Sequence, residues 1–254
     1  MYETGGDNPG ARPGRPVETP ISVVDVSALE GVAKGGLDLD RLPHPAASRL
    51  KRGFDLVLSA TGLILAAPVM LLVALLIYIA DGGAPIFAQT RYGRDGRPFR
   101  FYKFRSMARG ADIRLEALLR ADAEIEREWR KRRKLRDDPR ITAFGRFIRK
   151  WSIDELPQLF NVLRGDMSMV GPRPLVKSGE AVLDDRALYG ADFRIYARAR
   201  PGITGLWQVS GRADTAFSER VAHDLDYVTN WSMARDAWIL VKTIPAVLLR
   251  RGAH

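Results

Sequence analysis

The sequence predicts an α+β fold that is mainly helical, and three observations support this prediction. Residues 56–80 form an uncharged, strongly apolar stretch that is long enough for a membrane helix. Two segments, Ile86–Arg91 and Phe99–Met107, flank an Asp95-Gly96 step, which is typical of a β-hairpin. Most other apolar residues recur at helical spacing. We therefore expect several helices and one short hairpin.

The composition narrows the class of partner. The chain has 254 residues, and 40 Lys and Arg against 30 Asp and Glu give a formal net charge of +10. Such a charge favours anionic partners, among them lipid headgroups, nucleotide phosphates and nucleic acid, without choosing between them. The sequence contains no cysteine, which excludes disulfides and thiolate metal sites.

The first 45 residues are expected to form a disordered tail. Residues 1–20 are rich in Gly, Pro and charged residues, and they lack the apolar segment of a secretory signal. A mildly apolar stretch follows and ends at Gly35-Gly36. We therefore predict a disordered cytosolic N-terminal tail over residues 1–45 and assign no chemistry to it.

Residues 46–82 are expected to be a membrane anchor, and two topologies fit them. The stretch 56–80 is long enough to cross a bilayer as one helix, and hydropathy alone favours that topology. Basic residues on both sides of the stretch instead favour placing both of its ends in the cytosol. Pro68 lies near the middle, where a kink would give two arms of about 12 residues, each about 18 Å long, that re-enter one leaflet.

Two further helices are expected to be peripheral. Apolar residues in Asp112–Arg136 are spaced for one side of a single long helix, which ends in the basic run 130–134. Such a run usually marks an exposed face, and lipid or nucleic-acid contact is the alternative. We expect residues 109–137 to be a peripheral helical segment that touches headgroups or a partner subunit. Trp238–Leu249, with nearby cations, is expected to be an amphipathic helix at a membrane surface.

The segment Arg149–Pro174 contains the candidate chemistry. Ser152, Asp154 and Glu155 are expected to open a helix that ends at Arg164-Gly165. The Ser-x-x-Glu spacing also fits a capping box, in which the Ser152 and Glu155 side chains bind free backbone N–H groups. That structural role leaves Asp154 unexplained.

These side chains suit phosphoryl transfer. Adjacent helix positions face different directions, so Asp154 could act as a nucleophile on phosphorus while Glu155 holds a metal ion. Arg149 and Arg173 carry the fork-shaped guanidinium group that binds pairs of phosphate oxygens. A helix N-terminus at the same place would also favour a bound phosphate.

Two motifs resemble a known family. Residues 152–174 read Ser-Ile-Asp-Glu-Leu-Pro-Gln-Leu-Phe-Asn-Val-Leu-Arg-Gly-Asp-Met-Ser-Met-Val-Gly-Pro-Arg-Pro, and residues 200–212 read Arg-Pro-Gly-Ile-Thr-Gly-Leu-Trp-Gln-Val-Ser-Gly-Arg. Together they resemble the bacterial sugar transferase family, the monotopic polyprenol-phosphate phosphoglycosyl transferases. The resemblance runs from about Lys51 to the C-terminus and is closest to the small enzymes that start exopolysaccharide repeat units.

The resemblance implies a reaction. A member of this family would transfer hexose 1-phosphate from a UDP-hexose to undecaprenyl phosphate and release UMP, through a covalent phosphosugar intermediate on Asp154. Galactose and glucose are the leading hexoses, although the sequence does not separate them from an N-acetylated sugar. Mg²⁺ or Mn²⁺ would be held by Asp154 and Glu155. The reaction would be the first membrane step of exopolysaccharide biosynthesis.

The resemblance also implies a location. It makes residues 46–82 a re-entrant helix-kink-helix centred on Pro68, and residues 83–254 a compact catalytic domain with amphipathic interfacial helices. This domain would lie on the cytoplasmic face of the bacterial inner membrane. Anionic lipids are expected partners, a second copy of the chain is a candidate partner, and no nucleic acid is expected.

Further residues join the predicted site through the resemblance. Lys103, which periodicity alone assigns to a solvated basic strand, is placed near the active site. Arg200 and Arg212 flank a glycine-rich loop, in which Pro201-Gly202 fits a type II turn, and they are expected to contact nucleotide phosphates. Asp236 opens the last helix, where an acid suits the helix dipole, and it matches a family position linked to the active site.

Two other functions stay open on the sequence alone. A membrane-bound nucleotide-sugar pyrophosphohydrolase could use the same carboxylates and arginines with water as the acceptor. A noncatalytic basic membrane scaffold would explain the net charge and the apolar stretch. Such a scaffold would not need Asp154 beside Glu155.

Overall fold

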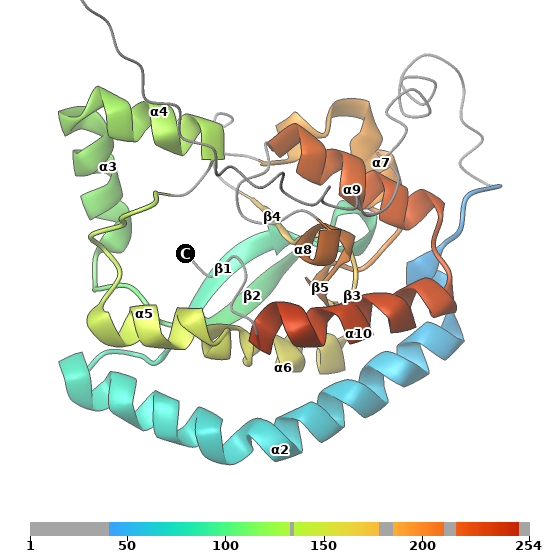
Figure 1. Cartoon of the computed structure of the whole chain (residues 1–254), viewed down its shortest axis with the longest axis horizontal. Coiled ribbons are helices and arrows are strands. Elements are labelled where there is room, and N and C mark those ends of the chain that lie inside the picture. Colours follow the sequence, from blue (N-terminus) through green and yellow to red (C-terminus); the bar gives the residue numbers. More distant parts are fainter. Residues whose placement is uncertain (1–40, 133–134, 178–184, 211–216, 249–254) are drawn as a thin grey trace, which may run out of the picture.

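Helices surround two small sheets in the computed structural model, which describes residues 41–132, 135–177, 185–210 and 217–248 (Figure 1). The helices are α2 (Arg49–Asp81), α3 (Ala111–Ala121), α4 (Ala123–Arg132), α5 (Ala143–Lys150), α6 (Gln158–Arg164), α7 (Phe193–Tyr196), α8 (Leu206–Ser210), α9 (Phe217–Thr229) and α10 (Met233–Leu248). The strands are β1 (Ile86–Tyr92), β2 (Pro98–Phe104), β3 (Ser168–Val170), β4 (Leu175–Val176) and β5 (Gly202–Thr204). The prediction of a mainly helical α+β chain is confirmed.

α2 is one continuous helix that contains Pro68. It begins after Ser48, whose side chain accepts a hydrogen bond from the Lys51 backbone N–H, and it ends at Gly82, whose φ of 65° is typical of a left-handed cap. Figure 1 shows that α2 bends near its middle, the part in which proline removes a backbone hydrogen bond. The re-entrant topology remains a prediction.

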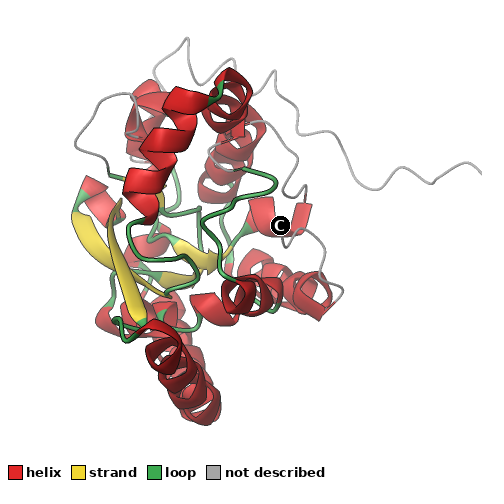
Figure 2. Cartoon of the chain, turned by 90° about the vertical axis from the view of Figure 1, so that its left-hand side faces the viewer, coloured by secondary structure: helices red, strands yellow, loops and turns green. Residues whose placement is uncertain are grey.

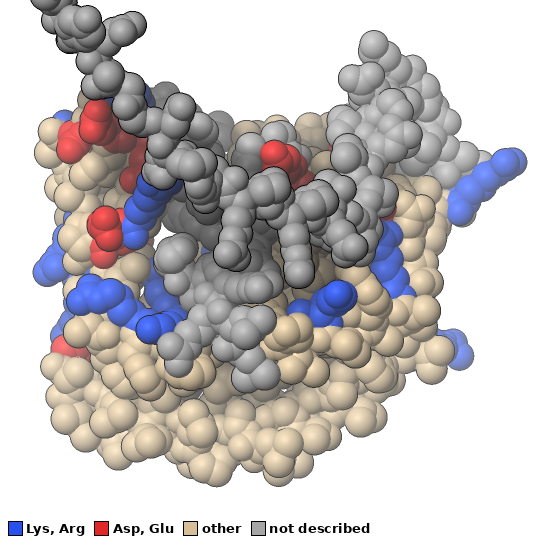
Figure 3. Space-filling view, viewed as in Figure 1, with Lys and Arg blue, Asp and Glu red and all other residues tan. Residues whose placement is uncertain are grey.

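The surface of α2 is apolar. Among the described helices, it alone is long and apolar enough to cross a membrane. Leu65 and Leu71 are 75% and 73% exposed, and many other apolar side chains of α2 are exposed as well. In Figure 3 the side of the molecule formed by α2 is a tan band nearly free of charged side chains, which lie above it. Figure 2 shows α2 projecting from the body of the protein, in which the strands lie between helices.

Buried polar contacts fix the first turns of α2 to the rest of the protein. Lys51 is 2% exposed, and its ammonium donates to the Val170 carbonyl oxygen at 2.9 Å and to the Asp236 carboxylate at 2.6 Å. One turn later, the Asp55 carboxylate accepts hydrogen bonds from the Ser168 hydroxyl and from the next backbone N–H, each at 2.9 Å. Because a buried charge is costly without a partner, these contacts hold α2 in one orientation against β3.

The predicted tail is described only at its end. Residues 1–40 lie outside the described part of the chain. Residues 41–45 pack against the domain, because the Arg198 guanidinium donates to the carbonyl oxygens of Leu42 and Pro43. Pro45 then opens a 3₁₀ turn, η2 (Pro45–Ala47), and is buried.

The predicted hairpin is present. β1 and β2 pair antiparallel from Ile86 opposite Phe104 to Tyr92 opposite Pro98, and β4 pairs with the other edge of β1. The chain turns at Asp95-Gly96, where both residues have positive φ, 57° and 70°. β1 also carries Tyr92 into an aromatic core cluster with residues of the segment 189–196.

β3 and β5 form a separate parallel pair that the sequence did not predict. Their close contact requires glycine, because a Cβ on Gly171 would lie 2.2 Å from the Arg200 carbonyl oxygen. Gly205 is constrained in the same way, since a Cβ there would lie 2.1 Å from the Gly171 carbonyl oxygen. The predicted type II turn at Pro201-Gly202 is wrong, because Gly202 opens β5 and lacks the positive φ that this turn requires.

The predicted single helix over Asp112–Arg136 is in fact two helices, α3 and α4. They meet at Asp122, which has an extended backbone. The Asp122 carboxylate accepts a hydrogen bond from the Glu124 backbone N–H at 2.7 Å. An N-cap thus interrupts a segment in which the apolar residues keep helical spacing.

Candidate active site

The Asp-Glu pair lies in a short 3₁₀ turn rather than in the first turn of an α-helix. This turn, η4 (Ile153–Glu155), precedes α6, which begins at Gln158. Ser152 has a left-handed backbone with a φ of 54°, and its side chain makes no capping hydrogen bond. The predicted capping box is therefore wrong, and Asp154 and Glu155 have other partners.

Lys103 connects the two carboxylates. It extends from β2, and its ammonium lies 2.8 Å from Oε1 of Glu155 and 3.7 Å from Oδ2 of Asp154. Asp154 is 5% exposed, whereas the Glu155 side chain is 37% exposed. The structure thus brings three of the predicted residues together, with one cation shared by a buried and a partly exposed carboxylate.

These surroundings move the pKa values of the two carboxylates apart. Burial raises the pKa of Asp154, and the ammonium of Lys103 offsets only part of this effect. Burial acts in the same direction on Glu155, but Lys103, followed by Arg173, lowers the pKa of Glu155 below its ordinary value. Two carboxylates whose pKa values diverge are suited to two roles. Asp154 has the more basic oxygen, and Glu155 ionises more readily.

Arg149 approaches the pair from the last turn of α5. Its Nε donates to the Ser106 hydroxyl at 2.7 Å, and its guanidinium is close enough to Asp154 to oppose the rise in the pKa of that carboxyl. α5 begins after Thr142, whose hydroxyl accepts a hydrogen bond from the Gly145 backbone N–H. A Cβ on Gly145 would lie 1.8 Å from the Ser106 carbonyl oxygen, so glycine lets α5 pack directly on the segment after β2.

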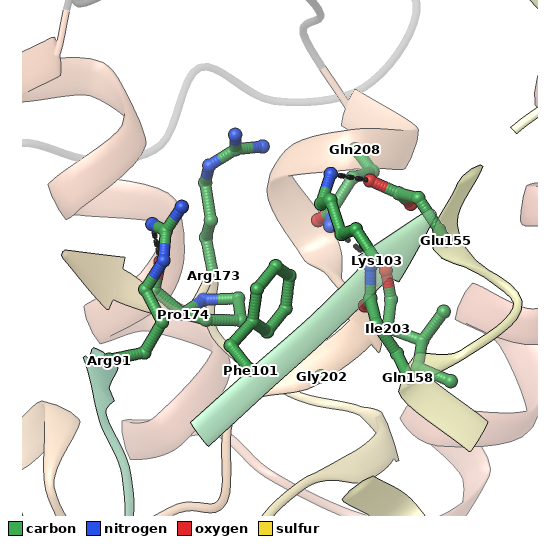
Figure 4. Close-up of a pocket in the computed structure, with 10 residues that line it drawn as sticks. All are labelled: Arg91, Phe101, Lys103, Glu155, Gln158, Arg173, Pro174, Gly202, Ile203 and Gln208. Atoms are coloured by element: carbon green, nitrogen blue, oxygen red, sulfur yellow. Dashed lines mark hydrogen bonds and ion pairs between the residues drawn. The ribbon is translucent and has the colours of Figure 1, made fainter. Parts of the chain in front are cut away.

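A small, partly open cleft lies beside Glu155 (Figure 4). The residues that line it come from both sheets, η4, α6 and α8: Arg91, Phe101, Lys103, Glu155, Gln158, Arg173, Pro174, Gly202, Ile203 and Gln208. Figure 4 shows Arg91 and Arg173 on one side of Phe101, and the Lys103–Glu155 pair on the other. The lining of the cleft combines three cations with the Glu155 carboxylate, a composition that suits a phosphate-bearing ligand.

Arg173 is supported from several sides. Its guanidinium lies 5.1 Å from the centre of the Trp207 ring, and the guanidinium of Arg220 lies 4.6 Å from the centre of the same ring. The Arg173 backbone N–H donates to the Asp224 carboxylate at 3.3 Å, and the Tyr189 hydroxyl donates to it at 2.7 Å. Burial raises the pKa of Asp224 to about 7 despite these hydrogen bonds.

Two carboxylates are available for a metal ion. Within the described residues, no group of three or more His, Cys, Asp or Glu side chains is placed to hold one. Mg²⁺, however, keeps several waters and is usually held by one or two carboxylates together with substrate phosphates. Asp154 and Glu155, adjacent at the edge of the cleft, fit that donor set.

Arg200 and Asp236 have partners away from the Asp154–Glu155 pair, and Arg212 is not described. Arg200 donates to two backbone carbonyl oxygens, at 3.0 and 2.9 Å. Asp236 is 1% exposed and pairs with Lys51. Arg212 lies outside the described residues. The roles of these residues in substrate binding therefore remain predictions.

Sequence reasoning missed several residues around the cleft: Arg91, Gln158, Gln208, Arg220 and Asp224. The predicted hairpin offered a signal for Arg91. Arg91 lies opposite Phe99, which shares a face of the sheet with Lys103, so Arg91 is on that face too. Gln158 lies within the recognised motif and is 2% exposed, which marks a constrained polar side chain. Arg220 and Asp224 lie on α9, and nothing in the sequence pattern linked that helix to Arg173.

Comparisons with known proteins agree with the motifs. A model of the bacterial sugar transferase family matches residues 46–250. The exopolysaccharide production protein ExoY of Rhizobium meliloti is 45% identical over 211 residues, which cover 83% of this chain and 91% of that protein. The undecaprenyl-phosphate galactose phosphotransferase of Salmonella typhimurium is 50% identical over 205 residues, 81% of this chain and 42% of that protein.

A third relative carries a different sugar in its name. The UDP-glucose:undecaprenyl-phosphate glucose-1-phosphate transferase of Caulobacter vibrioides is 42% identical over 224 residues, which cover 84% of this chain and 75% of that protein. The family model spans most of the chain and includes α2, η4 and α10. The protein therefore belongs to the bacterial sugar transferase family.

Proposed function

We propose that this protein is a phosphoglycosyl transferase that moves hexose 1-phosphate from a UDP-sugar to undecaprenyl phosphate and releases UMP. The observation that carries this function is the Asp154–Glu155 pair, joined by Lys103 at one side of a cleft that also contains Arg91 and Arg173. The names of relatives support the reaction class and suggest galactose or glucose as the hexose. The reaction would begin exopolysaccharide synthesis.

Asp154 is the proposed nucleophile. Its carboxylate oxygen forms a bond to the phosphorus that carries the sugar, and the bond from that phosphorus to the bridging oxygen breaks, so UMP leaves with the electron pair. The raised pKa of Asp154 supports this role, because a more basic oxygen is the better nucleophile. Glu155, whose pKa is lowered, stays ionised and keeps the Lys103 ammonium at the site.

The second step returns the enzyme to its starting state. An oxygen of undecaprenyl phosphate bonds to the phosphorus of the phosphosugar–aspartate, the bond to the Asp154 oxygen breaks, and the carboxylate is restored. The product is an undecaprenyl diphosphate hexose, whose new anhydride retains most of the energy of the old one. Lys103 and Arg149 reduce the repulsion between the anionic reactants in both steps.

Mg²⁺ or Mn²⁺ is part of the proposed function, with Glu155 and Asp154 as its protein ligands. When bound, such an ion neutralises charge on phosphate oxygens. Chelation should stop UMP release, and added Mg²⁺ should restore it. Unchanged release in metal-free buffer would exclude the metal.

We also propose that α2 is a re-entrant helix in the cytoplasmic leaflet of the bacterial inner membrane. Its exposed apolar side chains support contact with lipid. Figure 1 shows both ends of the bent helix turned toward the rest of the protein, which favours both ends lying on one side of the membrane. Anionic lipids would then meet the basic residues at those ends.

The experiment that tests the function is a panel of UDP-sugars incubated with the full-length protein and undecaprenyl phosphate. UMP release and the mass of the lipid product are measured. We expect product with UDP-galactose or UDP-glucose. Asp154→Asn, which removes the anionic oxygen at nearly constant shape, should abolish product, while the exposed control Asp137→Asn should leave it unchanged.

The same assay separates the other candidate functions. A pyrophosphohydrolase would release UMP over many turnovers without undecaprenyl phosphate. A scaffold would give no lipid product at all, and Asp154→Asn would leave its membrane binding intact. Full activity of Asp154→Asn would exclude the covalent step.

A further inference from the structure

The cleft contains a second cationic group, and we propose that it binds the phosphate of the departing UMP, so that each phosphate of the UDP-sugar has its own cations. This assignment rests on the proposed function and divides its site into two parts. Lys103 and Arg149 lie near Asp154, where the transferred phosphorus would be. The second group, hereafter the arginine cluster, consists of three side chains that come from different elements: Arg91, Arg173 and Arg220.

The arginine cluster is held together by aromatic and backbone contacts. Trp207 stacks with the guanidiniums of both Arg173 and Arg220. The Arg91 guanidinium donates to the carbonyl oxygen of Pro174, the residue after Arg173, at 3.0 Å. Strand β1, the segment before β4 and helix α9 thus bring three cations to one place.

Charge around the arginine cluster is balanced only in part: Asp185 and Asp224 oppose the repulsion between the arginines, and the third carboxylate, Glu155, is paired with Lys103. Burial, followed by repulsion from Arg173, lowers the pKa of Arg91 to about 10 and that of Arg220 to about 10, so both stay charged at neutral pH. The Asp224 carboxylate nearby binds the Arg173 backbone N–H and the Tyr189 hydroxyl. Asp224 also titrates near neutrality, since burial raises its pKa to about 7. An added anion would therefore be favourable here.

One donor of the arginine cluster has no partner. The Nε atom of Arg91 is buried and makes no hydrogen bond within the described structure. Its two other guanidinium nitrogens bind Pro174 and the Gln89 side chain. An unpaired buried donor is costly, and an incoming phosphate oxygen is the acceptor that would satisfy it best.

The geometry of phosphoryl transfer determines which phosphate lies here. The attacking and leaving oxygens lie roughly in line on opposite sides of the phosphorus. Figure 4 shows the Lys103–Glu155 pair on one side of Phe101, and Arg91 with Arg173 on the other. The Lys103 ammonium is 5.6 Å and the Arg91 guanidinium is 5.1 Å from the centre of the Phe101 ring, so a diphosphate lying along this ring contacts both. The leaving phosphate then falls on the arginine cluster.

UMP binding tests this assignment. Equilibrium dialysis with labelled UMP would use the full-length protein in lipid nanodiscs, with Asp154→Asn in every sample to prevent turnover. We expect Arg91→Gln and Arg220→Gln each to weaken UMP binding roughly 10- to 100-fold, the loss of one charged hydrogen bond. Binding of hexose 1-phosphate should change little. Arg100→Gln, an exposed cation on β2 beside Phe101, is the control and should bind UMP normally.

Steady-state kinetics in protein that retains Asp154 distinguish an effect on the binding of undecaprenyl phosphate from an effect on the binding of UMP. The KM for undecaprenyl phosphate should stay the same in Arg220→Gln, whereas inhibition by UMP should weaken. Unaltered UMP binding in folded variants, or a loss confined to undecaprenyl phosphate, would overturn the assignment. If the more deeply buried Arg91→Gln does not fold, Arg220→Gln decides alone. If the unsubstituted protein transfers hexose 1-phosphate but the arginine variants bind UMP normally, only this assignment is rejected. If the unsubstituted protein transfers nothing, the proposed function is rejected.

Discussion

Asp154 and Glu155 show how two adjacent carboxylates acquire different properties. In a 3₁₀ turn their side chains diverge, so Asp154 becomes buried while Glu155 faces the open cleft and lies 2.8 Å from the Lys103 ammonium. Sequence reasoning predicted the pair and the cations near it, Lys103, Arg149 and Arg173. It did not predict the difference in pKa, because burial raises the pKa of both carboxylates and the folded chain places the Lys103 ammonium closer to Glu155 than to Asp154.

Asp224 gives a stability test at the same scale. Burial raises its pKa to about 7 in the folded protein, whereas an unfolded chain has an Asp pKa of about 3.9. Between these values the folded state keeps a proton that the unfolded state has lost. This group therefore lowers stability as pH rises from about 4 to about 7, by up to about 1.4 kcal/mol per pH unit, and the effect levels off above that range.

We expect Asp224→Asn to remove this contribution. The free energy of unfolding of the variant, measured with urea at pH 5 and pH 7, should change less between the two pH values than that of the unsubstituted protein. The exposed Asp137→Asn should keep the original difference. Equal differences in all three proteins would contradict a raised pKa for Asp224.

At the scale of elements, some local signals were confirmed and others failed, and long-range pairing was not predictable. The hairpin turn at Asp95-Gly96 and the helix end at Gly165, whose φ is 88°, both follow from residues that favour left-handed backbone. The break at Asp122 was missed because the apolar spacing continues through it. The β3–β5 pair joins short strands more than 30 residues apart, and no local pattern reveals it.

The close contact between β3 and β5 makes Gly171 sensitive to substitution. Gly171→Ala would place a methyl group 2.2 Å from the Arg200 carbonyl oxygen and 2.7 Å from the Gly202 backbone nitrogen. Backbone atoms on both sides cannot move aside as a flexible side chain can. We expect a loss of about 1–3 kcal/mol in the free energy of unfolding, typical of overpacking, and reduced transfer because Gly171 is two residues from Arg173.

Thermal unfolding and transfer rates measure both effects. Gly53→Ala is the control, because it lies in α2 and a Cβ there meets nothing within 4 Å. That variant should be neutral or more stable by up to about 1 kcal/mol, the difference in helix propensity between Ala and Gly. Similar melting temperatures for the two variants would show that the sheet contact tolerates a side chain.

Over the whole molecule, the candidate site is assembled from parts that lie far apart in the sequence. The motif at residues 152–174 could be recognised because its residues are contiguous. Arg91 and Arg220 reach the same cleft region from β1 and α9, through the Phe101 and Trp207 rings, and only the folded chain shows this. Sequence reasoning therefore gave the chemistry near Asp154 and missed the support of Arg173.

The Lys51–Asp236 pair links three elements and can be tested by substitution. Lys51→Ala would leave Asp236 buried without its cation, although Tyr227 and Trp231 also donate to that carboxylate. We expect a loss of about 3–5 kcal/mol in the free energy of unfolding. Lys51→Met combined with Asp236→Leu removes both charges and should recover most of that loss. If the double variant is no more stable than Lys51→Ala, the cost of Lys51→Ala does not come from leaving the Asp236 charge unpaired.

The topology of α2 can be tested with single cysteines, because the chain contains none. Arg49→Cys and Ala84→Cys place a thiol at an exposed position near each end of the helix. A re-entrant helix predicts that a membrane-impermeant thiol reagent labels neither variant until the inner membrane is opened. Labelling of one end from the periplasmic side would establish a crossing.

The contact between Lys51 and Val170 has a mechanical consequence. Val170 is only three residues from Arg173, and the ammonium of Lys51 joins it to the first turn of α2 without a flexible linker in between. The first turn of α2 is therefore held directly against the segment that carries Arg173 into the cleft. If α2 lies in lipid as proposed, the depth at which its apolar surface settles would set the height at which a lipid phosphate meets Asp154.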